Sequence, residues 1–269
     1  MNSNAECVSP LEFVTTRERM ISRSTGWVAG ADRPVEVWVA GHSLVLRVEG
    51  FRDFYISPNG RAILPADGPS ELTMVEQEVV LGPGLVLALA LGGKWCLHAS
   101  AVLYNEQGSI FLGESGYGKS TLAAYLDIQR NRNWRRITDD ILPVTLGEGS
   151  LLGWPHFPQL KLPTEKHPGL ALPEKVQINR IYLLTPVSLE KSPTVCLLST
   201  NEAARVLLGH IAGARLFTPE LLAAHLDFCA QATRQIAVYR LSYPHRWDIL
   251  PVLKELLEQP IESSIPFLN

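Results

Sequence analysis

The feature that most constrains the fold is the glycine-rich stretch GESGYGKS at residues 113–120. It matches the pattern G-x-x-x-x-G-K-[ST] in full, a pattern that joins a buried strand to the start of a helix. The flanking sequence agrees, because SIFLG (109–113) is apolar like a buried strand and KSTLAAYL (119–126) is typical of a helix. The stretch therefore predicts an α/β fold with a phosphate-binding loop between a strand and a helix.

The residue types in this loop suit a nucleotide. Its glycines let backbone N–H groups converge on phosphate oxygens, and the N-terminus of the following helix adds a partial positive charge. Lys119 is expected to reach the β- and γ-phosphates, while the Ser120 hydroxyl helps to hold Mg²⁺. ATP and Mg²⁺ are the predicted cofactors, with GTP left open as a donor. The residues expected to bind them are Gly113, Ser115, Gly116, Tyr117, Gly118, Lys119, Ser120 and Thr121.

The overall charge and the cysteines narrow the kinds of partner. The 269 residues carry a formal net charge of −3, so no basic surface is expected to attract nucleic acid. The four cysteines are scattered, with no CxxC pair and no spacing typical of a metal site. They are expected to be free thiols in a reducing cytosol.

The most apolar stretch, VVLGPGLVLALALGG (79–93), raises the question of a membrane segment. A bilayer needs about 20 apolar residues, and this stretch is shorter and is interrupted by Gly82, Pro83 and Gly84. A buried helix that starts near Pro83 fits better, because proline is favourable in a first turn. The N-terminus also lacks a basic-then-apolar signal pattern, so we expect a cytoplasmic protein that does not bind membranes.

Residues 1–78 are typical of a β-rich N-terminal region. Residues 1–25 are polar and are expected to be loosely ordered. Beyond them, short apolar runs separated by turn residues indicate strands, and Asn59-Gly60 is a hairpin signal. The expected strands are 35–41, 44–50, 53–57 and 61–65.

Residues 79–269 are expected to form a second unit that contains the loop. Its expected strands are 96–104, 109–113, 135–140, 141–147, 150–154, 179–186 and 236–243, with 141–147 and 150–154 forming a hairpin. Helices are expected at 119–126, at 201–211 after a cap at Thr200 or Asn201, at 219–233 after Thr218, and at 247–259 from near Pro251.

Two further groups flank the loop in the sequence. His98 precedes it and Asp139-Asp140 follows it at the end of an expected strand. A lone histidine beside a strand is often structural, and adjacent acids often form a turn or a helix cap. In a phosphate-loop fold, however, an acid at the end of a neighbouring strand holds Mg²⁺, and a second acid can accept the proton of an attacking hydroxyl. We find no glutamine-bearing switch segment, GTPase base-reading motif or ABC-type signature, which favours transfer to an acceptor over hydrolysis.

The order LHASAV (97–102), then the loop, then TDD (138–140) resembles the HPr serine kinase/phosphorylase family. The resemblance spans roughly residues 95–140. It implies a P-loop kinase core of the HPr kinase type, with the β-rich region before it. The implied catalytic residues are Asp140, Asp139, His98 and Lys119. Asp140 is our choice for the base, and Asp139 with Ser120 for the metal, although the two acids could exchange roles; His98 would orient the acidic pair or contact the phosphate.

The layout of the whole chain is similar to the HPr-kinase-related proteins encoded near lasso-peptide gene clusters. PHFPQLKL (155–162) and VYRLSYP (238–244) add to this likeness. The resemblance implies phosphorylation of a serine, often the C-terminal one, of a precursor peptide. Thr121 stands where the bifunctional enzymes have an acid, and no segment resembles their glycine-rich IRGMG signature. Both departures favour a one-way kinase over a reversible enzyme.

Other functions remain open from the sequence. The acceptor could be another protein or a small hydroxy compound, and a regulatory ATPase or GTPase module without an acceptor, or a scaffold that binds ATP structurally, would carry the same loop. A homo-oligomer is compatible with each of these. Weaker candidates for phosphate or peptide contacts, each equally typical of an exposed solubilising charge, are Lys161, Arg205, Arg215 and Arg234.

Overall fold

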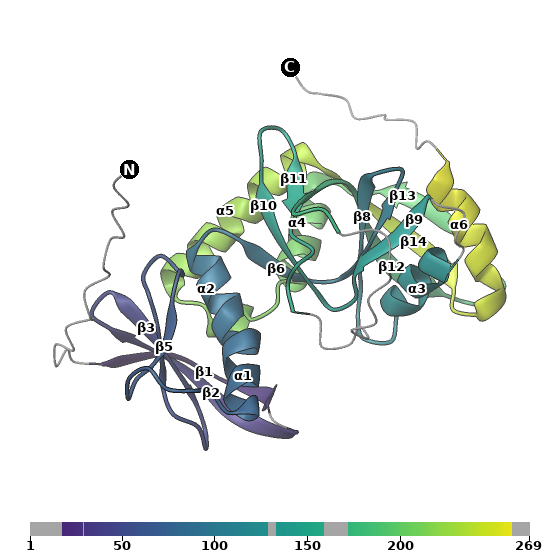
Figure 1. Cartoon of the computed structure of the whole chain (residues 1–269). Coiled ribbons are helices and arrows are strands. Elements are labelled where there is room, and N and C mark those ends of the chain that lie inside the picture. The colour runs from purple at the N-terminus through teal and green to yellow at the C-terminus, as the bar shows by residue number, and fades with distance from the viewer. Residues whose placement is uncertain (1–17, 29, 129–132, 159–171, 260–269) are drawn as a thin grey trace, which may run out of the picture.

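The computed structural model describes residues 18–28, 30–128, 133–158 and 172–259. Figure 1 shows a small N-terminal sheet at one end of the molecule and a larger sheet that carries helices on its faces. The α/β fold expected from the loop and the β-rich N-terminal region are both present.

The small sheet is antiparallel throughout, in the order β1-β2-β3-β4-β5. Its strands are β1 (Arg19–Val28), β2 (Ala31–Ala40), β3 (Ser43–Val48), β4 (Phe54–Ile56) and β5 (Ile63–Pro65). The last four agree with the sequence analysis, including the hairpin around Asn59-Gly60. The expectation of loose order before residue 26 is wrong for residues 19–25, which belong to β1. This strand lies at the sheet edge and is mostly exposed, so its pairing with β2 depends on backbone hydrogen bonds and leaves no apolar alternation to detect.

A helical run follows the small sheet as α1 (Met74–Val79), a π-helical turn η1 (Val80–Gly84) and α2 (Leu85–Leu91). Gly82 has non-helical backbone angles (φ −93°, ψ −105°), so the run consists of two helices that meet at a kink, and the second begins near Pro83 as expected. The first helix was not predicted from the sequence, and it begins at a capping box. The Thr73 hydroxyl accepts from the Glu76 N–H at 3.3 Å, and the Glu76 carboxylate accepts from the Thr73 N–H at 2.8 Å. Pro83 lies in the wider π-helical turn, the kind of interruption at which a helix tolerates a missing N–H donor.

Of this run, α2 is the buried helix expected from the sequence. By length and composition alone, Met74–Leu91 could cross a membrane. In the structure 33% of this run is buried, and the run contacts both parts of the chain: Gly84 lies against Leu46 of β3, and Val86 lies against Gly213. The residues of the run that belong to the buried core are Val79, Val86, Leu87, Ala88 and Ala90.

Within the described residues, the larger sheet has nine strands, and the strand before the loop is near its centre. Its main order is β6 (Trp95–His98), β10 (Ile141–Leu146), β11 (Leu151–Gly153), β12 (Val176–Val187), β8 (Gln107–Leu112), β7 (Ser100–Tyr104) and β9 (Trp134–Thr138). β14 (Ala237–Pro244) also pairs with β12, and β13 (Thr194–Leu197) pairs with β14. β8, β12 and β14 are parallel, and the other pairings are antiparallel.

Two details of this sheet differ from the sequence analysis. The single strand expected over 96–104 is two strands, because the chain leaves β6 at Ala99 and enters β7 with different partners. β13 has no counterpart among the expected strands; its side chains are largely exposed, so it carries little apolar signal. The hairpin of β10 and β11 is confirmed.

Helices cover the two faces of the larger sheet. In β8, Ile110 and Leu112 belong to the core cluster of α2, α4 (Thr200–Gly209) and α5 (Pro219–Gln235). Phe111 between them belongs to the cluster of α3 (Lys119–Ile128) and α6 (Leu250–Glu258). Because neighbouring side chains of a strand point to opposite faces, both faces at β8 are buried under helices, as is usual for parallel strands.

The ends of these helices follow local sequence signals. α5 begins after Thr218, with Pro219 in its first turn, and Pro251 lies in the first turn of α6, both as expected. The cap of α4 is Ser199, one residue before the expected Thr200, because its hydroxyl and Glu202 form a second capping box. Two short 3-10 turns, η2 (Ala214–Leu216) and η3 (Trp247–Ile249), precede α5 and α6.

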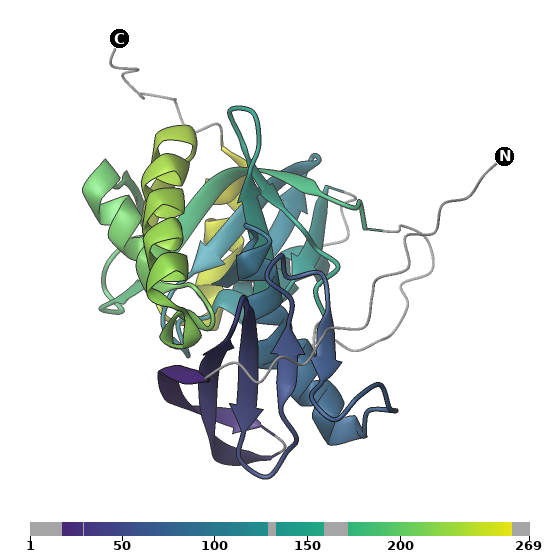
Figure 2. The ribbon, with the colours of Figure 1, turned by 90° about the vertical axis from the view of Figure 1, so that its left-hand side faces the viewer.

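One core joins the small sheet to the rest of the molecule. Phe54 of β4, Leu87 of α2 and Ile181 of β12 belong to a single buried cluster. Figure 2 shows the small sheet directly below the larger one, with the helical run beside it. The position between residues 78 and 79, expected to separate two units, falls inside the helical run, and the division into two units stays a prediction.

Candidate functional site

The loop of residues 113–118 lies where β8 ends and α3 begins. Gly116 and Gly118 have φ of 84° and 83°, a region that a residue with a side chain rarely adopts. Ligands of parallel α/β sheets bind beyond the carboxyl ends of the strands, and the loop leaves β8 at that end, beside the parallel strands β12 and β14. The local geometry is therefore that of an anion-binding loop at a helix N-terminus.

Lys119 is held inside the loop. Its side chain is buried, and the ammonium donates to the carbonyl oxygens of Gly113 at 2.7 Å and Glu114 at 3.1 Å. A buried ammonium needs such partners, because its charge is costly to remove from water. These bonds hold the Lys119 ammonium beside the loop, close to where an anion bound by the loop amides would lie.

The two acids lie at a break between paired strands. β6 and β7, joined by Ala99, run antiparallel to β9 and β10, joined by Asp139-Asp140. The Ala99 N–H donates to the Asp140 carbonyl at 2.9 Å. The turn that carries the acids is thus held against the break that follows His98.

The carboxylates of the two acids have different partners. The Ser100 hydroxyl donates to Asp139 Oδ1 at 3.2 Å, and the Arg136 guanidinium lies 3.9 Å from Oδ2, with the Asp139 side chain 10% exposed. His98 Nε2 lies 3.3 Å from Asp140 Oδ1, and these side chains are 53% and 25% exposed. Asp139 is therefore the more enclosed acid, and Asp140 is the acid that faces solvent together with a histidine.

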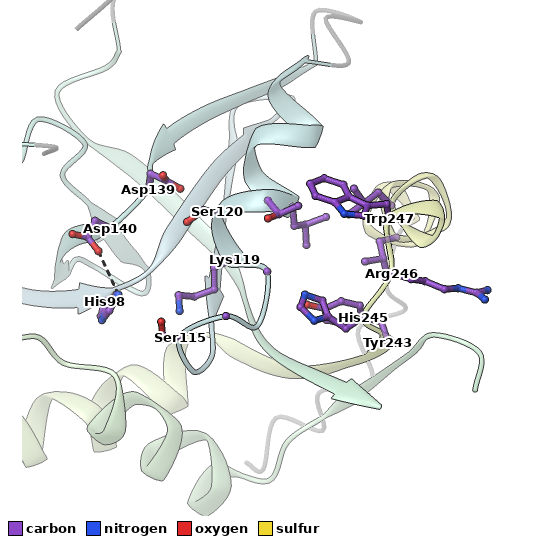
Figure 3. Close-up of a pocket in the computed structure, with 16 residues that line it drawn as sticks. His98, Ser115, Lys119, Ser120, Asp139, Asp140, Tyr243, His245, Arg246 and Trp247 are labelled. Carbon is purple, nitrogen blue, oxygen red and sulfur yellow. Dashed lines mark ion pairs between the residues drawn. The ribbon is translucent and has the colours of Figure 1, made fainter. Parts of the chain in front are cut away.

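A cavity of about 420 Å³ brings the loop and the acids together. Figure 3 shows Lys119 between the His98–Asp140 pair on one side and the segment from Tyr243 to Trp247 on the other. Of the predicted site residues, those that line the cavity are His98, Ser115, Gly116, Gly118, Lys119, Ser120, Thr121, Asp139 and Asp140. Gly113 and Tyr117 are not among the lining residues; their carbonyl oxygens accept from Lys119 and from the Tyr243 hydroxyl, respectively.

The wall opposite the acids was not predicted from the sequence. Its lining residues come from the end of β14, η3 and α6, namely Tyr243, His245, Arg246, Trp247, Leu250 and Leu253. Burial raises the pKa of Tyr243 to about 12, so its phenol stays a hydrogen-bond donor to the Tyr117 carbonyl. VYRLSYP was expected to be a strand, and residues after a parallel strand lie at the binding edge, but the parallel pairing of β14 with β12 is known only from the structure.

His210 does not line the cavity, but it is hydrogen-bonded to the backbone of His98. Its carbonyl accepts from the His98 N–H at 2.7 Å, and the Ala212 N–H donates to the Cys96 carbonyl at 2.7 Å, so this segment extends the edge of β6. His210 Nδ1 lies 2.7 Å from the Val206 carbonyl, which leaves Nε2 as the acceptor of a neutral ring. Burial lowers the pKa of His210, and the nearby charges of Lys119 and His98 lower it further.

The oxygen ligands of the cavity fit Mg²⁺ bound together with phosphates. Among the described residues no group of three or more His, Cys, Asp or Glu side chains could hold a metal by itself. Mg²⁺ at phosphate sites usually takes only one or two carboxylates, with phosphate oxygens and water as its other ligands. Ser120, Asp139 and Asp140 line one cavity and match that donor set.

The weaker candidates do not contribute to the cavity. Arg205, Arg215 and Arg234 are exposed and are not among the residues that line it. Lys161 and the rest of 159–162, the second half of the PHFPQLKL segment, lie outside the described residues.

The comparisons with known proteins found similarity to solved structures alone. No protein-family model matches the chain, and no curated protein matches it. Among solved structures, the chain is similar to the Hpr(Ser) kinase/phosphatase from Coxiella burnetii, at 14% sequence identity and a TM-score of 0.33. The match covers 60% of this chain and 93% of that one. A likeness at this level does not establish a shared activity.

Proposed function

We propose that this protein is an ATP-dependent kinase that phosphorylates a serine hydroxyl. One observation carries the proposal: the loop with Lys119 and the cluster of His98, Asp139 and Asp140 line the same cavity. A loop alone would suit any nucleotide-binding protein. A paired acid and histidine facing it adds the group that a hydroxyl acceptor needs.

The loop side of the cavity would bind the donor. The loop amides and the Lys119 ammonium would hold the β- and γ-phosphates, with Ser120 and Asp139 as the protein ligands of Mg²⁺. The bound Mg²⁺ would neutralise phosphate charge. Asp139 suits this role because Ser100 and Arg136 fix its carboxylate in a nearly buried position.

The other acid would act on the acceptor. As the serine oxygen attacks the γ-phosphorus and the bond to the bridging oxygen breaks, ADP leaves and Asp140 takes the hydroxyl proton. His98 contacts the Asp140 carboxylate and would hold it toward the acceptor. Because phosphoryl transfer depends mainly on positioning and charge neutralisation, these few residues suffice.

The acceptor that we propose is the C-terminal serine of a precursor peptide, as the resemblance to kinases of lasso-peptide clusters implies. We further propose a cytoplasmic protein, with no nucleic-acid or membrane partner, that can act as a homo-oligomer. The half-exposed His98 side chain leaves the acidic side of the cavity open to a chain terminus.

The test is incubation with Mg-ATP and peptides that end in serine, or in alanine as a matched control, read by mass. We expect a gain of one phosphate on the serine peptide, and a loss of about 10²- to 10⁴-fold in rate for Asp140→Asn. ATP affinity should be nearly unchanged in this variant. The control variant is Glu190→Gln, at an exposed acid that does not line the cavity, and it should behave as wild type.

Two results would overturn the proposal. ADP formation without any phosphorylated peptide would indicate a regulatory ATPase. Phosphorylation of free serine or another small hydroxy compound, with no peptide accepted, would retain the kinase chemistry and reject the peptide substrate.

A further inference from the structure

The cavity has two chemically different ends. Its acidic end is at the β7 and β9 side of β8, where Asp139 and Asp140 follow β9. The other end is at the side of β12 and β14, where His245, Arg246 and Trp247 follow β14. Figure 3 shows the loop and Lys119 between these two ends.

The position of the charges sets the direction of a bound nucleotide. The Lys119 ammonium and the acids mark where the terminal phosphates would lie. The nucleoside must then leave the loop on the opposite side, toward the segment after β14. This segment borders the loop directly, since a Cβ placed on Gly118 would lie 3.5 Å from His245 Nε2.

Trp247 is unusual for a tryptophan in a folded chain. It is 77% exposed, although its neighbours Ile249 and Leu250 belong to the buried core. It nevertheless lines the cavity. A large aromatic face that is open to a ligand cavity can stack on a base, which is worth a substantial part of the affinity of nucleotide-binding proteins.

We propose that Trp247 is the platform on which the nucleobase of the donor stacks, with His245 beside the sugar and the first phosphate. This proposal rests on nucleotide binding at the loop, which the proposed kinase function shares. The site would recognise the base by its face and not by its edges. Among the described residues that line this end, none is Asn, Gln, Asp or Glu, and the Arg246 guanidinium pairs with Asp248 at 3.2 Å and points away from the loop in Figure 3.

A site that recognises the base only by its face is expected to accept more than one nucleotide as donor. Every base has a π face, so stacking discriminates weakly between bases. ATP and GTP should therefore bind with dissociation constants within about threefold of each other. Inorganic triphosphate, which has no base, should bind without using Trp247.

The experiment measures the binding of ATP, GTP and inorganic triphosphate by calorimetry to the full chain. Trp247→Ala should weaken ATP and GTP about tenfold each and leave inorganic triphosphate unchanged. Trp247→Phe should keep most of the affinity for both nucleotides. The matched control is Trp27→Ala, a tryptophan in β1 that is 73% exposed and should have no effect. Thermal melting of each variant verifies folding.

The outcomes separate this proposal from the kinase proposal. Equal weakening of ATP and inorganic triphosphate by Trp247→Ala, or no weakening of ATP, would overturn the stacking platform. GTP binding more than about thirtyfold weaker than ATP would overturn face recognition. Another outcome is that Trp247→Ala weakens the binding of ATP and GTP but not of inorganic triphosphate, while no acceptor is phosphorylated. That combination would support the base site and reject the kinase function.

Discussion

At the scale of single residues, Gly116 and Gly118 share a backbone conformation and differ in their surroundings. Their φ angles are 84° and 83°, where a side chain causes strain. A Cβ on Gly116 would meet no atom within 4 Å, whereas one on Gly118 would lie 3.0 Å from the Tyr243 hydroxyl oxygen. A side chain would therefore clash only at Gly118, which is the position where the loop pattern requires glycine. At Gly116 the pattern allows any residue.

We expect Gly118→Ala to cost more stability than Gly116→Ala. The strain of a left-handed conformation costs about 1 kcal/mol in both variants. Gly118→Ala would in addition displace the Tyr243 hydroxyl from the Tyr117 carbonyl, for a further loss of about 1 kcal/mol. Urea denaturation gives the free energy of unfolding of each variant. Equal losses would show that the contact with Tyr243 has no energetic role.

The residues of the acidic end could be predicted because the sequence orders them in a recognisable pattern. His98, Lys119 and the two acids each stand beside an expected strand or helix, so their meeting at one sheet edge follows from the fold. Trp247 could not be predicted in this way. Nothing in the local sequence distinguishes an exposed tryptophan that lines a cavity from one packed in a core, and only the position of β14 beside β12 places it there.

At the scale of elements, the signals that were missed are local and polar. Thr73 and Glu76 have the spacing of a capping box, yet only the helix after Pro83 was predicted and α1 before it was not. The edge strand β1 was missed for a different reason, namely that its sequence carries no signal of a strand. Its pairing with β2 depends on backbone hydrogen bonds, so its side chains carry no pattern that could predict it.

Helix α5 buries a histidine whose charge state couples stability to pH. His225 is 2% exposed, stacks on Trp95 with ring centroids 5.1 Å apart, and lies 3.3 Å from the Cys229 sulfur. Burial lowers the pKa of His225 below its ordinary value of 6.5. In the unfolded chain this side chain takes up a proton near pH 6.5, while in the folded protein it stays neutral to lower pH.

The expected result is a loss of stability as pH falls below about 6.5, with no contribution above it. The contribution of one histidine amounts to at most about 1.4 kcal/mol per pH unit between the unfolded and folded pKa values. Urea denaturation of wild type and His225→Gln at pH 7.5, 6.5 and 5.5 measures it. The variant should show a shallower slope even if it is less stable throughout, and an unchanged slope would contradict burial of the neutral ring. His210 contributes in the same direction and remains in both proteins.

At the scale of the whole molecule, strand order is what the sequence could least predict. The strands of the larger sheet were mostly expected, but their neighbours are distant in the chain. β12 pairs with β8 on one edge and with β11 and β14 on the other. These pairings depend on packing between helices and sheet faces, which local patterns do not encode, and they decide which loops meet at the cavity.

The shared core predicts that the small sheet and the larger part unfold together. Leu87 of α2 is fully buried in the cluster that also contains Phe54 of β4 and Ile181 of β12. Leu87→Ala should therefore lower the free energy of unfolding by about 2–5 kcal/mol. The variant should destabilise the small sheet and the larger sheet alike. Leu226→Ala, at a leucine of α5 that is 56% exposed, should change it by less than about 0.5 kcal/mol.

Hydrogen exchange distinguishes a joint transition from two separate ones. If the core is one cooperative unit, Leu87→Ala will lower protection of the slowest amides in β3 and in β12 by the same factor, because both exchange only through global unfolding. If the small sheet were an independent unit, the variant would lower protection in β3 while β12 kept its wild-type value. The second result would support two units, with the helical run belonging to the N-terminal one and the boundary after Leu91 instead of between residues 78 and 79.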